Sequence, residues 1–168
     1  GCSFRRAVLE AAGRPQTDRP ITIVFDLAAN DPNKDLNATG TWTIALDGAL
    51  PPLRTPTIVN KNGQVTIDGA SQPNGRTGAP PILIDMDDNA WSIESTNNVF
   101  RNLSFKKIGG LDFKTGANDN LVEHVWMGLT DDGAAIDLRD PASPVRLAIG
   151  GGVIFRGNTS GNIVRESK

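Results

Sequence analysis

Few residues in this sequence have side chains suited to catalysis, and they are scattered. His124 is the only histidine, and a lone histidine at a bend more often shapes a turn than acts as a base. Trp42, Trp91 and Trp126 could form a flat platform for sugar rings. Because they belong to different parts of the chain, we expect each to pack in the core or at its edge. These residues therefore predict no catalytic set.

The candidates for covalent modification are one cysteine and three sequons. Cys2 is the only cysteine, so it cannot close a disulfide within the chain, and one thiol is too few for a metal cluster. Asn-x-Ser/Thr sequons occur at Asn37, Asn102 and Asn158. Asn37 lies in a long polar insertion, residues 30–37, and is the best placed of the three for a glycan.

The composition fits one β-rich domain spanning residues 1–168. The chain carries a net charge of −2, so no basic field favours nucleic acid or an anionic lipid surface. No apolar run approaches the roughly 20 residues needed to span a bilayer. The 18 glycines and 11 prolines indicate many turns, and a core of Val, Ile and Leu favours β-architecture over a helical bundle.

One short helix is expected, over residues 3–12. Ser3 is a good N-cap, and the apolar residues that follow have the spacing of one helical face. That face consists of Phe4, Ala7, Val8 and Ala11. Gly13 and then Pro15 end the helix.

Short β-type runs bounded by Gly, Asn, Asp or Pro fill residues 20–168. No helical stretch separates them, which excludes alternating βαβ units. A sandwich, a barrel and a solenoid remain. The first six runs are Ile21–Phe25, Trp42–Leu46, Thr57–Val59, Val65–Ile67, Ile82–Ile84 and Trp91–Ile93.

A repeat decides between these folds. Residues 98–105 align with residues 120–127. Each copy is followed by a second short run, and these two runs align Leu111 with Ile136. Trp91–Ile93 occupies the position equivalent to the Leu111 run one coil earlier. A period near 22 residues with two or three short strands indicates a right-handed parallel β-helix, in which equal positions of successive coils touch. The expected core stacks are Phe100 with Val122, Leu103 with Val125, and Phe105 with Met127.

The same alignment predicts the polar contacts between coils. Asn98 is expected to stack on Asn120 in an amide ladder, and Arg101 to lie beside Glu123 on the outside. Asn102 is expected at a sharp bend, because Asn tolerates the left-handed conformation. The helix over residues 3–12 would cover the N-terminal end of the coils, and the last run, Ile163 to Lys168, shows no such cap.

The N-terminal segment Cys2–Val8 reads Cys-Ser-Phe-Arg-Arg-Ala-Val. It resembles the Cys-Ser-Leu-Arg-Glu-Ala-Ile motif that opens many bacterial surface proteins with right-handed β-helix repeats; Phe4 and Arg6 depart from it. Thr66–Pro73 resembles a Thr-Ile-Asp-Gly-x-Ser-Gln-Pro signature of the same family, and Ile149–Asn158 its Gly-Asn coil. The resemblance implies an extracellular or cell-surface protein. It also implies that Cys2 lost a partner upstream or forms a disulfide between chains.

The family fold is shared with pectate lyases, and residues 99–105 and 121–125 also resemble lyase coils. That likeness places Asp112, Asp132 and Asp137 where lyases hold calcium, which implies calcium as the one candidate cofactor. However, the last two aspartates are five residues apart, where the lyase pattern has four, and no arginine lies in a matching motif. We favour a turn at Asp131-Asp132-Gly133 over a calcium site.

The expected function is therefore an extracellular structural or adhesion module, on a chain that could be a fragment of a longer one. Its partners would be further coils of the same protein or other copies, joined through the ends of the solenoid into a fibre. The alternatives are a calcium-dependent polysaccharide lyase and a non-catalytic carbohydrate-binding module.

Overall fold

The computed structural model describes residues 2–36, 38–57, 61–87, 89–106, 110–129 and 152–168. The fold is rich in β-strands, with one α-helix, α1 (Phe4–Gly13), and two 3-10 turns, Gln16–Asp18 and Gly69–Ser71. No helix in this part of the chain is long and apolar enough to cross a membrane. The strands are β1 (Ile21–Val24), β2 (Trp42–Ala45), β3 (Val65–Asp68), β4 (Ile82–Asp85), β5 (Ala90–Ile93), β6 (Val99–Arg101), β7 (Leu103–Lys106), β8 (Gly110–Phe113), β9 (Leu121–Glu123), β10 (Trp126–Met127), β11 (Val153–Phe155) and β12 (Ile163–Arg165).

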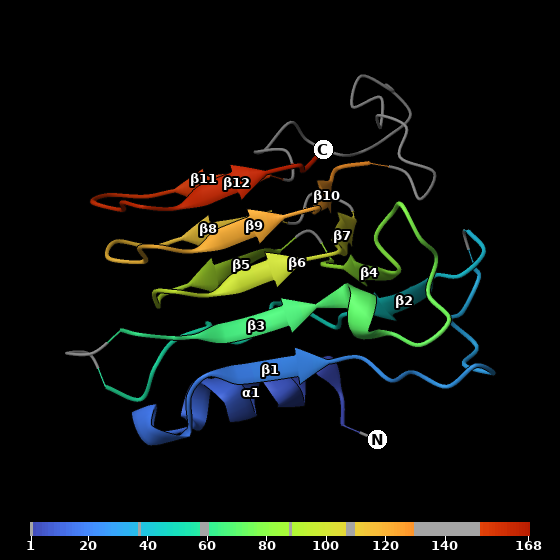
Figure 1. Ribbon diagram of the computed structural model, residues 1–168, viewed down its shortest axis with the longest axis horizontal. Coiled ribbons are helices and arrows are strands. Elements are labelled where there is room, and N and C mark those ends of the chain that lie inside the picture. The colour runs from blue at the N-terminus through green and yellow to red at the C-terminus, as the bar shows by residue number, and fades with distance from the viewer. Residues whose placement is uncertain (1, 37, 58–60, 88, 107–109, 130–151) are drawn as a thin grey trace.

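Three parallel sheets make up the molecule (Figure 1). Sheet A has the order β1-β3-β6-β9-β12, sheet B the order β2-β4-β7-β10, and sheet C the order β5-β8-β11. The chain visits A, B and C in that order and then starts again one layer higher, so each such passage is called a circuit. In the circuit that begins with β1, the segment next to sheet C is joined to it by a single parallel bridge between Leu53 and Ile93. Stacked parallel sheets of this kind are compatible with the predicted β-helix.

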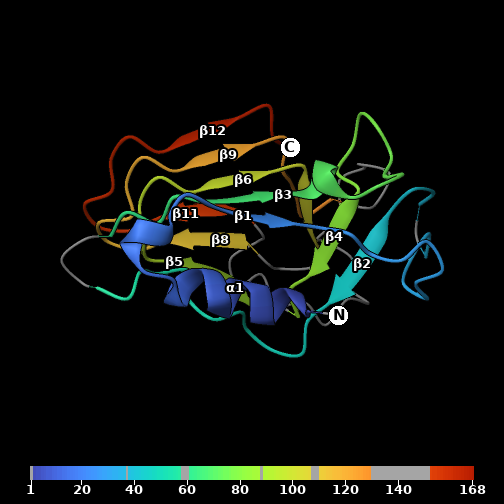
Figure 2. The ribbon, with the colours of Figure 1, turned by 60° about the horizontal axis from the view of Figure 1, so that its bottom comes forward.

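Helix α1 closes the lower end of the stack. The Ser3 hydroxyl accepts a hydrogen bond from the Arg6 backbone N–H at 3.2 Å, as expected of an N-cap. The buried face of the helix consists of Phe4, Val8 and Ala11, with Ala7 partly buried beside it. Figure 1 shows α1 beneath β1, and Figure 2 brings this end forward. The predicted helix and its apolar face are confirmed.

The strand register confirms two of the three predicted core stacks directly. Phe100 pairs with Val122 and Phe105 with Met127. Leu103 and Val125 are both fully buried, one position before the paired residues Ser104 and Trp126. Side chains at equal positions of successive circuits therefore do meet in the core.

The predicted match of Leu111 with Ile136 is wrong. On one side β8 pairs with β5, with Trp91 beside Leu111 as expected. On the other side Val153, in β11, takes the place beside Leu111. Residues 130–151, with Ile136 among them, lie outside the described residues. The interval from β8 to β11 is thus longer than the 25 residues that the alignment assumed.

An aromatic column runs through the core from α1 to the opposite end. Phe4 contacts Trp91 with ring centroids 5.8 Å apart, Trp91 contacts Phe100 at 5.6 Å, and Phe100 contacts Phe113 at 6.1 Å, all edge to face. Phe113 then stacks on Phe155 at 5.2 Å. Such pairs add to the stabilisation from buried area, so the column links the circuits along the direction in which they stack.

Asparagine side chains join the circuits where the chain enters sheet A. The Asn98 amide donates to the Asn120 side-chain oxygen at 2.8 Å, and the Asn120 amide donates to that of Asn162 at 3.0 Å. Asn98 Oδ1 in turn accepts from the Val65 backbone N–H. The predicted Asn98–Asn120 ladder is confirmed, and it extends one circuit further to Asn162.

The corner between sheets A and B is a single residue in the left-handed conformation. Asn102 has φ 56°, and the equivalent residues His124 and Glu166 have φ 50° and 52°. This confirms the bend expected at Asn102 and the turn role expected of His124. A positive φ strains a non-glycine residue, so the packing of the two sheets must hold these corners in place.

Charged residues alternate in sign along the outer face of sheet A. The register places Asp68 beside Arg101, Arg101 beside Glu123, and Glu123 beside Arg165. The predicted neighbourhood of Arg101 and Glu123 is therefore confirmed. The close ion pairs are Arg101 with Asp68 at 2.9 Å and Arg165 with Glu123 at 2.5 Å.

Candidate functional site

A column of charged residues follows the outer face of sheet C. Leu53, Ile93, Phe113 and Phe155 lie side by side in register and point inward. Because successive side chains of a strand point to opposite faces, the residue after each of them belongs to the outer face. That outer column consists of Arg54, Glu94, Lys114 and Arg156.

A buried carboxylate holds the upper two cations of this column. Asp112 lies in β8 and is 5% exposed. Its two oxygens accept from Lys114 Nζ at 2.5 Å and from Arg156 Nε at 2.8 Å. Charge-assisted hydrogen bonds of this length are the strong ones in proteins. Asp112 therefore fixes both cations while their outer atoms stay accessible, with side chains 39% and 52% exposed.

The protonation of Asp112 follows from these contacts. Burial raises the pKa of the Asp112 carboxyl, but the hydrogen bonds and charges of Lys114 and Arg156 lower it by more, so the pKa lies below its ordinary value. The Asp112 carboxyl is therefore ionised at neutral pH; with its partners Lys114 and Arg156 it is here named the Asp112 triad.

The column borders a pocket of about 900 Å³, here named the cationic pocket. Four cations and one carboxylate, Glu94, line it together with an apolar wall from α1 and a proline-rich loop. The excess of cations over carboxylates in this lining makes the pocket suited to binding an anionic group. The lining residues are Leu9, Ala12, Gly13, Pro51, Pro52, Arg54, Thr55, Pro56, Thr57, Lys61, Glu94, Lys114, Thr115 and Arg156.

Of the three aspartates predicted to bind calcium, only Asp112 is among the described residues. Asp112 lies beside the cationic pocket with its oxygens bound to Lys114 and Arg156. Calcium there would have to displace two positive charges from this carboxylate. Asp132 and Asp137 lie outside the described residues, as does the turn expected at Asp131–Gly133, so this site stays a prediction.

A second polar cluster lies at the corner between sheets A and B. Ligand atoms of Glu123, His124 and Glu166 lie within 4.8 Å of one another, and His124 Nε2 is 2.6 Å from a Glu166 oxygen. The cluster is mostly exposed, and Glu123 also binds Arg165, so it is weak evidence for a metal. Sequence reasoning missed Glu166 because its circuit begins 42 residues after the previous one, not 22.

The Thr66–Pro73 signature proves to be a clasp between three circuits. Asp68 accepts from the Ala70 backbone N–H and from the side chains of Arg101 and Asn102 in the next circuit. A Cβ at Gly69 would lie 1.9 Å from the Asn102 carbonyl oxygen, so only glycine fits this position. The Ser71 hydroxyl accepts from the Phe25 backbone N–H in the preceding circuit.

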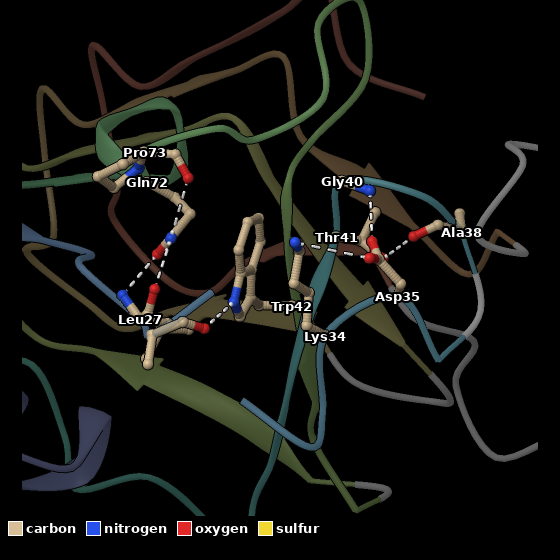
Figure 3. Close-up of polar contacts among 10 residues, drawn as sticks. Leu27, Lys34, Asp35, Ala38, Gly40, Thr41, Trp42, Gln72 and Pro73 are labelled. Carbon is tan, nitrogen blue, oxygen red and sulfur yellow. Dashed lines mark hydrogen bonds and ion pairs between the residues drawn. The ribbon is translucent and has the colours of Figure 1, made fainter. Parts of the chain in front are cut away.

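Gln72 completes the clasp (Figure 3). Its side chain is buried between the backbones of two segments, where Oε1 accepts from the Leu27 N–H at 2.8 Å and Nε2 donates to the Leu27 carbonyl at 3.0 Å. Nε2 also donates to the Pro73 carbonyl. The signature therefore has a structural role, because the side chains of Asp68, Ser71 and Gln72 are engaged within the fold.

The tryptophans do not form an exposed platform. Trp42 and Trp91 are 1% and 0% exposed; the Trp42 indole donates to the Ala28 carbonyl (Figure 3) and that of Trp91 to the Pro51 carbonyl. Trp126 is 8% exposed and lies against Arg76 and Lys168. The prediction that each packs in the core or at its edge is confirmed.

The modification candidates differ in their surroundings. Cys2 is exposed with a free thiol, which is compatible with the predicted disulfide between chains without testing it. The Asn102 amide donates to Asp68 at 2.8 Å and is therefore engaged, as expected, whereas Asn158 is exposed. Asn37 lies outside the described residues.

The cationic pocket is thus the candidate site, with the Asp112 triad as its ordered part. In comparisons with known proteins, the chain matches no family model, no curated protein and no solved structure.

Proposed function

We propose that the chain is a right-handed parallel β-helix that serves as a structural module of a secreted or cell-surface protein. The repeated visit to sheets A, B and C and the register between circuits support the solenoid. The surface location rests on the likeness of Cys2–Val8 and Thr66–Pro73 to bacterial surface proteins. A module of this kind acts through its shape and its ends.

The observation that carries the structural role is the contrast between those ends. Helix α1 covers the first circuit, whereas Phe155 and Val164 continue inward columns and are 44% and 45% exposed. Among the described strands, β11 and β12 end their sheets. Strand edges with apolar side chains favour pairing with further strands. This end is here named the open end.

We propose a second copy of the chain as the occupant of the open end. Its own β11 and β12 offer the same backbone edges and the same apolar residues, so two open ends can meet in a closed dimer. The end-to-end fibre expected from the sequence requires α1 either to move away from β1 or to form the contact itself, because α1 covers the surface that the next copy would meet. The closed dimer requires no such movement.

The test is self-association of the wild type and two matched variants. Analytical ultracentrifugation over a concentration series should show dimers, and Val164→Lys should weaken them about tenfold or more, because association would bury a charge. Val24→Lys is the control, since Val24 is 64% exposed on β1 at the opposite end. Monomers at every concentration would overturn self-association, and filaments in electron micrographs would favour the end-to-end fibre over the closed dimer.

The polysaccharide lyase is a lower-ranked alternative. It needs a calcium ion at Asp112, Asp132 and Asp137 and a base beside the substrate. A rise in ultraviolet absorbance on acidic polysaccharides that depends on calcium would support it, and a flat trace on all of them would count against it. The cationic pocket favours instead a module that binds a carbohydrate without cleaving it.

A further inference from the structure

We propose that the cationic pocket binds an acidic polysaccharide. The side-chain cations of the pocket would contact the carboxylate or sulfate groups of the polysaccharide, in place of a metal ion. The proposal rests on the pocket geometry, and the choice of a polysaccharide draws on the proposed surface location. The protein has a net charge of −2, whereas the four cations at this pocket outnumber the carboxylates Glu94 and Asp112 by two, so the pocket is a local excess of positive charge rather than part of a general basic field.

Two of these cations are fixed before any ligand arrives. Asp112 binds Arg156 through Nε, so this ion pair does not use the two terminal nitrogens of the guanidinium. Those nitrogens can bind a carboxylate or sulfate in the bidentate manner typical of arginine. Because Lys114 and Arg156 are already held by a buried partner, little side-chain entropy is lost when a ligand binds.

The other two cations are less engaged. Arg54 is exposed and has no hydrogen-bond or ion-pair partner among the described residues. Lys61 Nζ donates one hydrogen bond, to the Thr115 carbonyl at 3.0 Å, and an ammonium group has three protons to donate. Both side chains therefore have donors left for an anionic ligand.

The arrangement of the charges fits a sugar chain. Lys114 and Arg156 occupy equal positions of neighbouring circuits, about 4.8 Å apart, a step comparable with one pyranose of an extended polysaccharide, whereas an extended peptide repeats like side chains about every 7 Å. Arg54 lies two circuits from Lys114, with Glu94 between them. The apolar wall of Leu9, Pro51 and Pro52 can contact the C–H faces of the sugar rings. No aromatic residue is among the described lining residues, so recognition depends on charge rather than on ring stacking.

The first experiment measures binding by isothermal titration calorimetry. The probes are polygalacturonate, dextran sulfate, neutral dextran and poly-L-glutamate, each with calcium and with a chelator. The two acidic polysaccharides should bind in both conditions and bind more weakly in high salt. Arg54→Gln should weaken binding about three- to fivefold, the loss expected for one exposed charge pair. Arg6→Gln, which removes the same charge from the exposed Arg6–Glu10 pair, should leave binding unchanged.

A second variant removes the ordered part of the pocket. The triple change Asp112→Asn, Lys114→Gln and Arg156→Gln leaves no buried carboxylate unpaired, and it should weaken binding about tenfold or more. Self-association of Arg54→Gln should equal that of the wild type, which separates this proposal from the open-end proposal. Unchanged binding in both pocket variants, binding that needs calcium, equal binding of neutral dextran, or a preference for poly-L-glutamate would each overturn the proposal.

Discussion

The two ends of the core are built from the same kinds of side chain but have different surroundings. At the lower end Phe4 is 8% exposed and Val8 fully buried, because the helix that carries them lies against β1. At the open end Phe155 and Val164 continue the columns of Phe113 and Val122 and remain nearly half exposed. Stacking alone thus buries only one side of a terminal residue, and a separate element must cover the other.

The largest difference in lost unfolding free energy is expected between Phe4→Ala and Phe155→Ala. Phe4 packs on Phe25 and Trp91, with ring centroids 5.7 and 5.8 Å away, so its removal opens a cavity and should cost about 3 kcal/mol of unfolding free energy. Phe155 contacts Phe113 on one side, and its loss should cost about 1 kcal/mol. Urea unfolding measures both values. Equal losses would mean that the two ends are equally buried in solution.

The asparagine ladder should show the same contrast on a smaller scale. Asn98 is fully buried and binds both neighbouring circuits, so Asn98→Ala leaves buried groups without a partner and should cost about 2 kcal/mol. Asn162 is half-buried at the last step of the ladder, and Asn162→Ala should cost less than about 1 kcal/mol. Hydrogen exchange at the Val65 amide, which Asn98 binds, should speed up in the first variant and not in the second.

The effect expected for Asp112, near the open end, depends on pH. Because its pKa is lower in the folded protein than in the unfolded chain, ionised Asp112 stabilises the fold above its unfolded pKa, and this contribution is lost as pH falls through the folded pKa. Asp112→Asn should therefore cost about 1.5 kcal/mol at neutral pH and progressively less in acid. A cost that stays constant with pH would contradict this assignment.

Local patterns of the sequence predicted the middle of the molecule well. The 22-residue spacing of Asn98 and Asn120 places apolar residues on apolar residues, and the tolerance of Asn for the left-handed conformation predicts the bend at Asn102. Each of these features depends only on neighbours in adjacent circuits. They can therefore be found by aligning one circuit with the next.

Features that depend on the length of a whole circuit could not be predicted in this way. Successive strands of sheet A are 44, 33, 22 and 42 residues apart in register, so a fixed offset wrongly aligned Ile136 with Leu111. The cationic pocket was missed for the same reason. Arg54, Lys114 and Arg156 come from circuits of unequal length, and only the strand register shows that they share one column.

The alternating charges on sheet A limit how a chain of this design can grow by gene duplication. Copying a single layer would place Arg101 on a second Arg101, or Glu123 on a second Glu123, and like charges in contact are unfavourable. Copying the two layers together keeps the order of Asp68, Arg101, Glu123 and Arg165. The smallest insertion that preserves the electrostatic pattern is therefore a pair of layers, so lengthened descendants of this protein should differ from it by even numbers of layers.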